Sequence, residues 1–317
     1  MTAKPVFKQL MSAVLVLVLL AVNLPLAYER QADDPALPVK ARSLHVHRPR
    51  PKPFAFPDGG RQLIPAYRFV ALYGTPGNPA LGALGDQPLA DSIMRVQQLA
   101  SQYQPLTAQH VMPTLEIIAT IASETPTDNG DYSQEVPTAQ LEPWVAAARQ
   151  AGVYVVLDLQ SGRSDFLTQA KEYEPLLKQP NVGLALDPEW RLTPTEVPLV
   201  QIGTVDITEV NQTLDWLAAL TKHERLPQKL VVLHQFRLDM IQNRQALDTS
   251  HNNLALVIQM DGSGPQSTKL DTWRTITAGA PPDVHFGWKN FYHQDPALLD
   301  PAGTMAVQPQ PWYVSYQ

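Results

Sequence analysis

The chain has 317 residues, of which 44% are hydrophobic and 17% charged, and it contains no cysteine. A chain of this length can form one large domain or two small ones without disulfide staples. The missing cysteines exclude disulfide bonds, zinc–thiolate sites and thiol catalysis. The net charge of -6 is uneven: residues 1–62 hold nine Lys/Arg and four Asp/Glu, and the remainder holds fifteen and twenty-six. Such an acidic body argues against nucleic acid as a partner, because phosphate contacts need a basic face.

An uncharged apolar stretch runs from Leu10 to Ala27, after two lysines. Its length fits either a short membrane span or the core of a secretory signal. A cleavage after Ala27 would put Pro25 three positions before the cut, where proline fits badly, so we expect residues 1–27 to be an uncleaved anchor rather than a cleaved signal. The preceding lysines predict a cytoplasmic N-terminus and an extracytoplasmic body.

The next segment, residues 28–62, is rich in proline and in basic side chains. Proline stiffens such a segment into an extended spacer, and its basic groups are attracted to anionic lipid or wall polymer. We therefore expect a linker over residues 28–62 and a folded domain over residues 63–317.

Short apolar runs alternate with helical patterns through this domain. Strands are predicted over 69–73, 114–121, 153–159, 182–186, 229–233, 254–260, 284–288 and 312–316. Helical spacing is present over 91–103, 140–151, 164–177, 208–222, 239–247 and 268–278. Strands that are apolar on both faces and separated by helices indicate a parallel sheet covered by helices. Eight such units predict an α/β fold, a (β/α)8 TIM-like barrel.

An open, doubly wound sheet is the alternative architecture. It commonly carries a G-x-G-x-x-G dinucleotide fingerprint after its first strand. Here the first strand is followed by Gly74-Thr-Pro-Gly77, which lacks that spacing, and no P-loop lysine follows any predicted strand. The barrel is therefore the favoured prediction.

Polar side chains gather at the carboxyl ends of the predicted strands, where the active sites of barrels lie. In chain order, these ends carry Tyr73, Asp158, Gln160, Asp187, Glu189, His234, Gln259, Asp261 and Lys289. The amino ends carry no comparable set. This asymmetry predicts a ligand site at the carboxyl end of the barrel.

The acids among these residues indicate the reaction class, and Glu189, Asp187, Asp261 and Asp158 are the catalytic candidates. Hydrolysis of a sugar bond needs two carboxyl groups, one protonated and one ionised. Asp187 and Glu189 would share a face if their strand stays extended past its last apolar residue.

The apolar ring of Trp190 would raise the pKa of Glu189 and make it the acid, while Asp187 stays charged. The alternative role of Asp187 is structural, because an aspartate before Pro188 also suits a turn.

The remaining residues are candidates for substrate binding: Tyr73, Gln160, Trp190, His234, Gln259, Trp288, Lys289 and Trp312. The tryptophan rings are flat surfaces on which sugar faces could stack, although large aromatics at strand ends also serve packing. His234 could also act as a base or a metal ligand. Neither an H-E-x-x-H motif nor a G-x-S-x-G elbow is present, and we predict no metal and no other cofactor.

The strand ends LDPE (186–189) and IQMD (258–261) resemble those of family 18 glycoside hydrolases, the chitinase-like barrels. Members of that family carry D-x-x-D-x-D-x-E at the end of strand 4 and Met-x-Tyr-Asp on strand 6. The resemblance implies that Glu189 is the acid, that Asp187 is its partner and that Trp312 lines the sugar site. In this chain Ala185 replaces one of the upstream acids, and no tyrosine precedes Asp261.

The domain as a whole resembles uncharacterised bacterial secreted or membrane-anchored barrel proteins with the same LDPEW, HQF and MDG strand ends, which imply no reaction. Three hypotheses follow. The first is an extracytoplasmic, membrane-tethered, glycoside-hydrolase-like barrel that acts on a carbohydrate or cell-wall glycan by acid/base chemistry. The second is a non-catalytic barrel that binds such a glycan, and the third is a metal-dependent hydrolase that uses His234 and the acids. The sequence does not indicate an oligomeric state.

Overall fold

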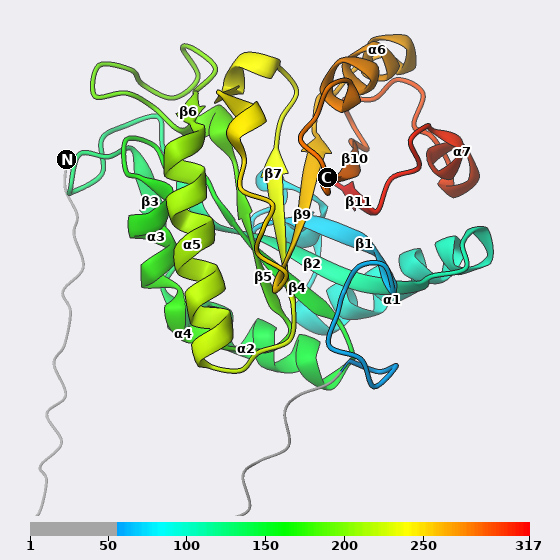
Figure 1. Cartoon of the computed structure of the whole chain (residues 1–317). Helices are drawn as coiled ribbons and strands as arrows, with labels where there is room; N and C mark the ends of the chain where they lie inside the picture. Colours follow the sequence, from blue (N-terminus) through cyan, green and yellow to red (C-terminus); the bar gives the residue numbers. More distant parts are fainter. Residues whose placement is uncertain (1–55) are drawn as a thin grey trace, which may run out of the picture. The chain divides into compact units, whose positions relative to one another are not determined.

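Eight parallel strands close into a barrel in the computed structural model, which describes residues 56–317 (Figure 1). Around the ring they are β1 (Tyr67–Gly74), β2 (His110–Ala122), β4 (Tyr154–Leu159), β5 (Val182–Leu186), β7 (Lys229–His234), β9 (Leu254–Met260), β10 (His285–Asn290) and β11 (Tyr313–Tyr316). Every neighbouring pair is parallel, and β11 pairs with β1, so the sheet has no open edge. The predicted TIM-like barrel is confirmed.

Helices cover the outside of this barrel. They are α1 (Leu89–Tyr103), α2 (Thr138–Gln150), α3 (Phe166–Glu172), α4 (Glu174–Leu177), α5 (Ile207–His223), α6 (Gln266–Thr277) and α7 (Pro301–Ala306). Short 3-10 turns are η1 (Pro79–Leu81), η2 (Ala83–Asp86), η3 (Gln104–Leu106) and η4 (Pro188–Trp190). The helix predicted over 164–177 is divided at Tyr173 into α3 and α4.

The helix predicted over 239–247 is wrong. That segment forms η5 (Leu238–Met240), the two-residue strand β8 (Ile241–Gln242) and η6 (Arg244–Ala246). Asn243 has a φ of 58°, a left-handed conformation that cannot continue an α-helix. β8 pairs with β6 (Val205–Asp206), and β3 (Ser133–Glu135) adds antiparallel to β2.

Alternation along each strand divides the buried side chains into two cores. One set faces the helices and includes Val155, Leu184 and Val231. The other set fills the barrel and includes Val156 and Ala185. Successive residues of a strand point to opposite faces, so one parity of every strand faces the barrel axis. Polar residues of that inward parity are therefore brought together inside the barrel.

The segment before β1 plugs the amino end of the barrel. Phe56 and Leu63 are buried among the inward side chains, although the sequence placed Phe56 in the linker. Gln228 fastens this plug, since its Oε1 accepts hydrogen bonds from Leu63 N at 2.8 Å and from Ile64 N at 3.2 Å.

The predicted anchor, residues 1–27, and most of the predicted linker lie outside the described residues. Among residues 56–317, no helix is both long and apolar enough to cross a membrane.

Truncation of the plug should destabilise the barrel. Leu63→Ala removes a fully buried side chain and should lower the free energy of unfolding by about 2–5 kcal/mol. The control is Leu106→Ala on an exposed leucine, which should cost no more than about 0.5 kcal/mol. Urea unfolding of residues 51–317 measures both values, and equal losses would contradict the assigned role of the plug.

Candidate functional site

A pocket of about 600 Å³ opens at the carboxyl end of the barrel. Seven of its lining residues were predicted from the sequence: Tyr73, Gln160, Asp187, Glu189, Trp190, Asp261 and Lys289. They come from β1, β10 and the segments that follow β4, β5 and β9. The predicted site at this end therefore exists as a cavity, and it is lined by carboxyl groups, an ammonium group and aromatic rings.

His234, the last residue of β7, holds the floor of this pocket together. Its Nε2 lies 3.0 Å from Oε1 of Glu116 on β2, and its Nδ1 lies 3.0 Å from Oδ2 of Asp261. Burial alone would lower the pKa of His234, but the charge of Asp158 and the hydrogen bonds to Asp261 and Glu116 raise it well above its ordinary value. These interactions favour the protonated ring, in which one nitrogen donates to Glu116 and the other to Asp261, and they disfavour His234 as a general base.

Asp158 lies beneath the pocket. Its Oδ2 accepts a hydrogen bond of 2.9 Å from the hydroxyl of Tyr73, and its Oδ1 is 3.8 Å from Nε2 of His234. Burial raises the pKa of Asp158, and the neighbouring His234 charge opposes that rise. Because its side chain is fully buried and does not line the cavity, Asp158 acts as support for Tyr73 and His234.

Glu189 lies in η4, directly after β5, and lines the pocket. Burial raises the pKa of Glu189 to about 7, and the nearby carboxylate of Asp261 adds to the rise. A carboxyl group with this pKa holds a proton at neutral pH and can release it. That property matches the predicted acid.

The loop after Glu189 is fixed by hydrogen bonds on both sides. Glu189 O accepts a hydrogen bond of 2.6 Å from Gly203 N. Arg191 Nε donates to Oε1 of Glu209 on α5 at 2.9 Å, and Arg191 Nη2 donates to its Oε2 at 3.0 Å. A two-point contact of this kind fixes orientation as well as distance. The backbone that carries the acid is thereby attached to α5.

Asp187 differs from its prediction in two respects. The chain turns into η4 directly after it, and Asp187 Oδ1 accepts a hydrogen bond of 3.3 Å from Glu189 N, so the strand does not stay extended. Burial raises the pKa of Asp187 well above its ordinary value, and the charge of His234 only partly opposes this. Asp187 is therefore disfavoured as the charged partner that the sequence suggested, although it does line the pocket.

Lys289 and Phe291 form the wall contributed by β10 and its loop. A buried ion pair holds this wall, since the ammonium of Lys269 on α6 contacts Oδ2 of Asp295. Lys269 Nζ also donates to Lys289 O at 2.8 Å, and Asp295 accepts from Phe291 N at 3.0 Å. A third hydrogen bond, from Gly264 N to Asp295 Oδ1 at 2.9 Å, ties the loop after β9 to the same point.

Four predicted binding residues do not line the pocket: His234, which is fully buried beneath it, Gln259, Trp288 and Trp312. Gln259 is fully buried inside the barrel and does not line the pocket. Trp288 points outward, because its neighbour Lys289 points inward, and its ring packs 5.6 Å from that of Trp273. These positions do not support sugar binding by Gln259 or Trp288.

Trp312 is also misplaced by the prediction. It directly precedes β11 and therefore lies at the amino end of the barrel, opposite the pocket. There its ring is covered by the guanidinium of Arg68 at 4.3 Å and contacts the ring of His285 at 5.0 Å. The role implied for it by the chitinase-like resemblance does not fit this position.

Several residues of the site were not predicted from the sequence, among them Glu116, Phe236, Arg237 and Phe291. Glu116 was overlooked because it lies inside a predicted strand rather than at its end; a single acid within TLEII was the available signal. Phe236 and Arg237 line the pocket from the loop after His234, and nothing in their local pattern distinguishes them from rim residues.

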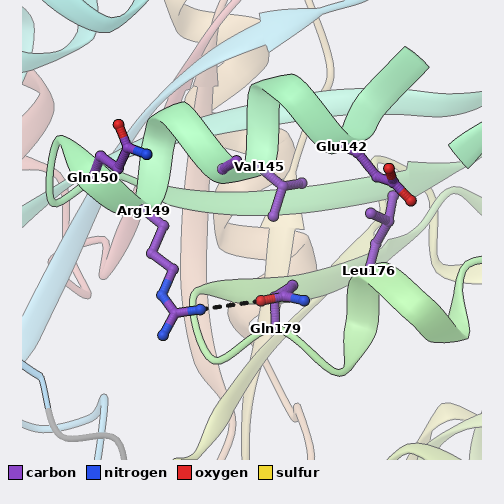
Figure 2. A pocket seen from close by; sticks show the side chains of 7 residues that line it. Glu142, Val145, Arg149, Gln150, Leu176 and Gln179 are labelled. Carbon is purple, nitrogen blue, oxygen red and sulfur yellow. Dashed lines mark hydrogen bonds between the residues drawn. The ribbon is translucent and has the colours of Figure 1, made fainter. Parts of the chain in front are cut away.

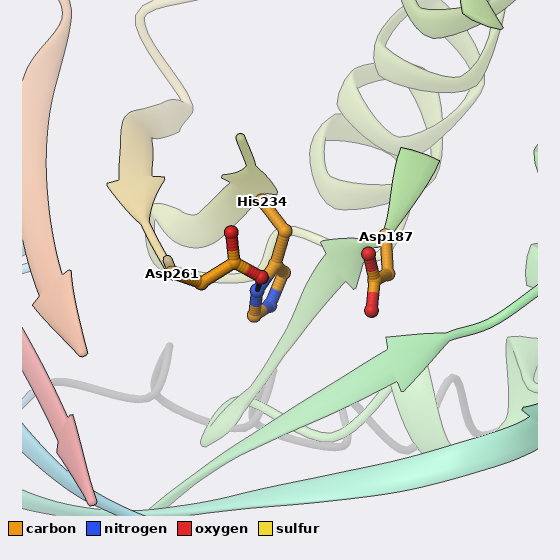
Figure 3. A group of neighbouring side chains, drawn as sticks. All are labelled: Asp187, His234 and Asp261. Carbon is orange, nitrogen blue, oxygen red and sulfur yellow. Dashed lines mark hydrogen bonds and ion pairs between the residues drawn. The ribbon is translucent and has the colours of Figure 1, made fainter. Parts of the chain in front are cut away.

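Asp187, His234 and Asp261 are grouped closely enough to be considered as metal ligands (Figure 3). Their ligand atoms all lie within 4.8 Å of one another. Metal binding needs a neutral imidazole nitrogen. Since both nitrogens of His234 face carboxylates and its pKa is raised, the group fits a hydrogen-bonded ion cluster better than a metal centre.

A second hollow lies outside the barrel, between α2 and the end of α4 (Figure 2). Its charged lining residues, Glu142 and Arg149, are exposed, and Arg149 Nη1 donates to Oε1 of Gln179 at 3.2 Å. It contains no buried titratable group. This hollow therefore offers no group suited to acid/base chemistry, unlike the pocket at the carboxyl end.

Comparisons with known proteins identify no family. No protein-family model and no curated protein matches the chain. Among solved structures, it is similar to a GH113 beta-1,4-mannanase, with 11% identity, a TM-score of 0.39 and coverage of 71% of each chain. A similarity at this level carries no argument about activity, and it shows no specific relation to family 18. The barrel itself is established by the strand pairing of this chain.

Removal of one partner from the Lys269–Asp295 pair should destabilise the protein. Lys269→Met leaves a buried carboxylate uncompensated, at a cost of about 3–5 kcal/mol in the free energy of unfolding. Arg274→Met breaks the exposed pair with Asp271 on the same helix and should cost at most about 1 kcal/mol. Denaturant titration of both variants measures the difference, and comparable losses would rule out the ion pair as the support of the β10 wall.

Proposed function

We propose that this barrel is a glycoside-hydrolase-like enzyme that cleaves a carbohydrate by carboxyl acid/base chemistry. The observation that supports this best is Glu189, a pocket-lining carboxyl group whose pKa is raised to about 7 beside a second carboxylate. Two carboxyl groups of opposite protonation are the requirement for hydrolysis of a sugar bond. The barrel strands are buried on both faces, and hydrogen bonds hold the loop that carries Glu189. Both features supply the fixed geometry that such chemistry needs.

In the proposed reaction, Glu189 donates its proton to the glycosidic oxygen as the bond between that oxygen and the anomeric carbon breaks. Asp261, the second carboxyl group of the pocket lining, acts as the base. Its Oδ2 is held by His234 Nδ1, which fixes the orientation of the carboxyl group. Asp261 accepts a proton from the water that attacks the anomeric carbon. The proton from Glu189 stays on the released hydroxyl group, and the hydroxide part of the water stays on the anomeric carbon. The proton on Asp261 is returned through solvent to Glu189, which restores both carboxyl groups for the next cycle.

The aromatic lining supports a carbohydrate as the substrate. Trp190, Phe236 and Phe291 all border the pocket, and flat apolar rings complement the apolar faces of sugars. The extracytoplasmic location and the membrane tether are also proposals, and they rest on the apolar stretch Leu10–Ala27 alone. The aromatic lining, the proposed location and the proposed tether together favour a wall or surface glycan as the substrate.

The acid role of Glu189 predicts both a rate loss and a pH dependence. Glu189→Gln should lower kcat by about 10²–10⁴-fold, because the amide cannot donate the proton, while glycan binding is retained. In the wild type, kcat/KM should fall as the pH rises through about 7, where Glu189 loses its proton. Reducing-end assays with a panel of wall glycans measure both effects.

Glu142→Gln, on an exposed glutamate of α2, is the matched control and should keep wild-type rates. If wild-type protein binds a glycan but turns none of the panel over, the barrel is a binding module and the enzymatic proposal fails. A Glu189→Gln variant with unchanged kcat would also contradict it.

A further inference from the structure

Lys289 is a buried cation that forms no direct ion pair with another described residue, although its charge acts on Asp158 and Glu189. Its side chain is only 3% exposed, yet it lines the pocket. Among the described residues, its ammonium forms no hydrogen bond and no ion pair, in contrast to the neighbouring Lys269. Lysine is almost never buried unless it is paired, because removing an ammonium group from water is costly.

Aromatic rings compensate for only part of this cost. The ammonium lies 3.4 Å from the ring centroid of Tyr73 and 5.3 Å from that of Phe291. A ring face attracts a cation but satisfies one direction only, and the ammonium has three N–H donors. Donors that are not used by the rings are available to a ligand in the pocket.

The position of Lys289 is built into the fold. Its backbone oxygen is held by Lys269 Nζ at 2.8 Å, and the hydroxyl of Tyr73 beneath it is held by Asp158 at 2.9 Å. The same lining carries Asp187, Glu189 and Asp261. The positive charge of Lys289 acts to lower the pKa of Glu189, against the larger effect of burial, so the ammonium lies within electrostatic range of that acid without forming an ion pair with it.

We propose that Lys289 binds a negatively charged group of the glycan, so that the substrate contains an acidic sugar with a carboxylate on its ring. The identification of the ligand as a sugar rests on the proposed function, whereas the anion site rests on Lys289 itself. Hydrogen bonds between an ammonium and a carboxylate are about twice as strong as neutral ones. A neutral sugar hydroxyl would leave the buried charge uncompensated.

Binding of three matched monosaccharides by the full-length protein tests this. Glucuronic acid, glucose and glucosamine share a ring and differ in charge, and NMR titration at constant ionic strength gives each Kd. Glucuronic acid should bind about tenfold more tightly than glucose, which corresponds to about 1.4 kcal/mol. Lys289→Met, which keeps the length of the chain but removes the charge, should abolish this preference, so that the Kd values for glucuronic acid and glucose become equal.

Lys171→Met, on an exposed lysine of α3, is the matched control and should keep the preference. Glu189→Gln should also keep it, so loss of turnover and loss of anion binding are separate results. An unchanged preference in a folded Lys289→Met protein, or a wild type that binds glucuronic acid no better than glucose, overturns the proposal. Inorganic phosphate is the last ligand to be titrated. If phosphate binds in a Lys289-dependent manner and glucuronic acid does not bind, the pocket is a site for free anions. That result would overturn the assignment of an acidic sugar.

Discussion

The hydrogen bonds of His234 are the interaction on which the rest of the site depends. One ring nitrogen contacts Glu116 on β2, across the barrel from β7, and the other contacts Asp261 after β9. Fully buried carboxylates repel each other, and a central imidazolium reduces that repulsion. Without it, the acids of the inward layer would face one another without compensation. The other oxygen of Asp261 is buried and has no hydrogen-bond partner among the described residues.

This arrangement separates the acids by depth. Glu116 and Asp158 are sealed beneath the pocket, where they hold His234 and Tyr73. Asp187 caps the turn that presents Glu189, and burial keeps its own pKa high. Glu189 and Asp261 line the cavity, and they are the two acids to which the proposed reaction gives proton transfer. In that proposal the same chemical group serves as support in one layer and as reagent in the next.

Much of this fold could be predicted from sequence, because buried parallel strands are apolar on both faces and are easily found. The position of the pocket could also be predicted, because once the strands were found, their carboxyl ends were seen to carry polar residues. What could not be predicted was side-chain direction. Trp288 and Lys289 are adjacent, and only the inward parity of β10 decides which of them lines the cavity. Glu116 was hidden inside a strand. Trp312 was assigned to the sugar site by the resemblance to family 18, although it stands at the amino end of its strand.

The most direct measurement is the pKa of Glu189. Carbon-13 labelling of the glutamate side-chain carboxyls allows each to be followed by NMR as the pH is changed. If Glu189 is the acid, one glutamate resonance of the wild-type protein titrates at about 7, and this resonance is absent from Glu189→Gln. If the resonance assigned to Glu189 titrates near 4.5, the ordinary value for glutamate, the residue is ionised at neutral pH and cannot be the acid.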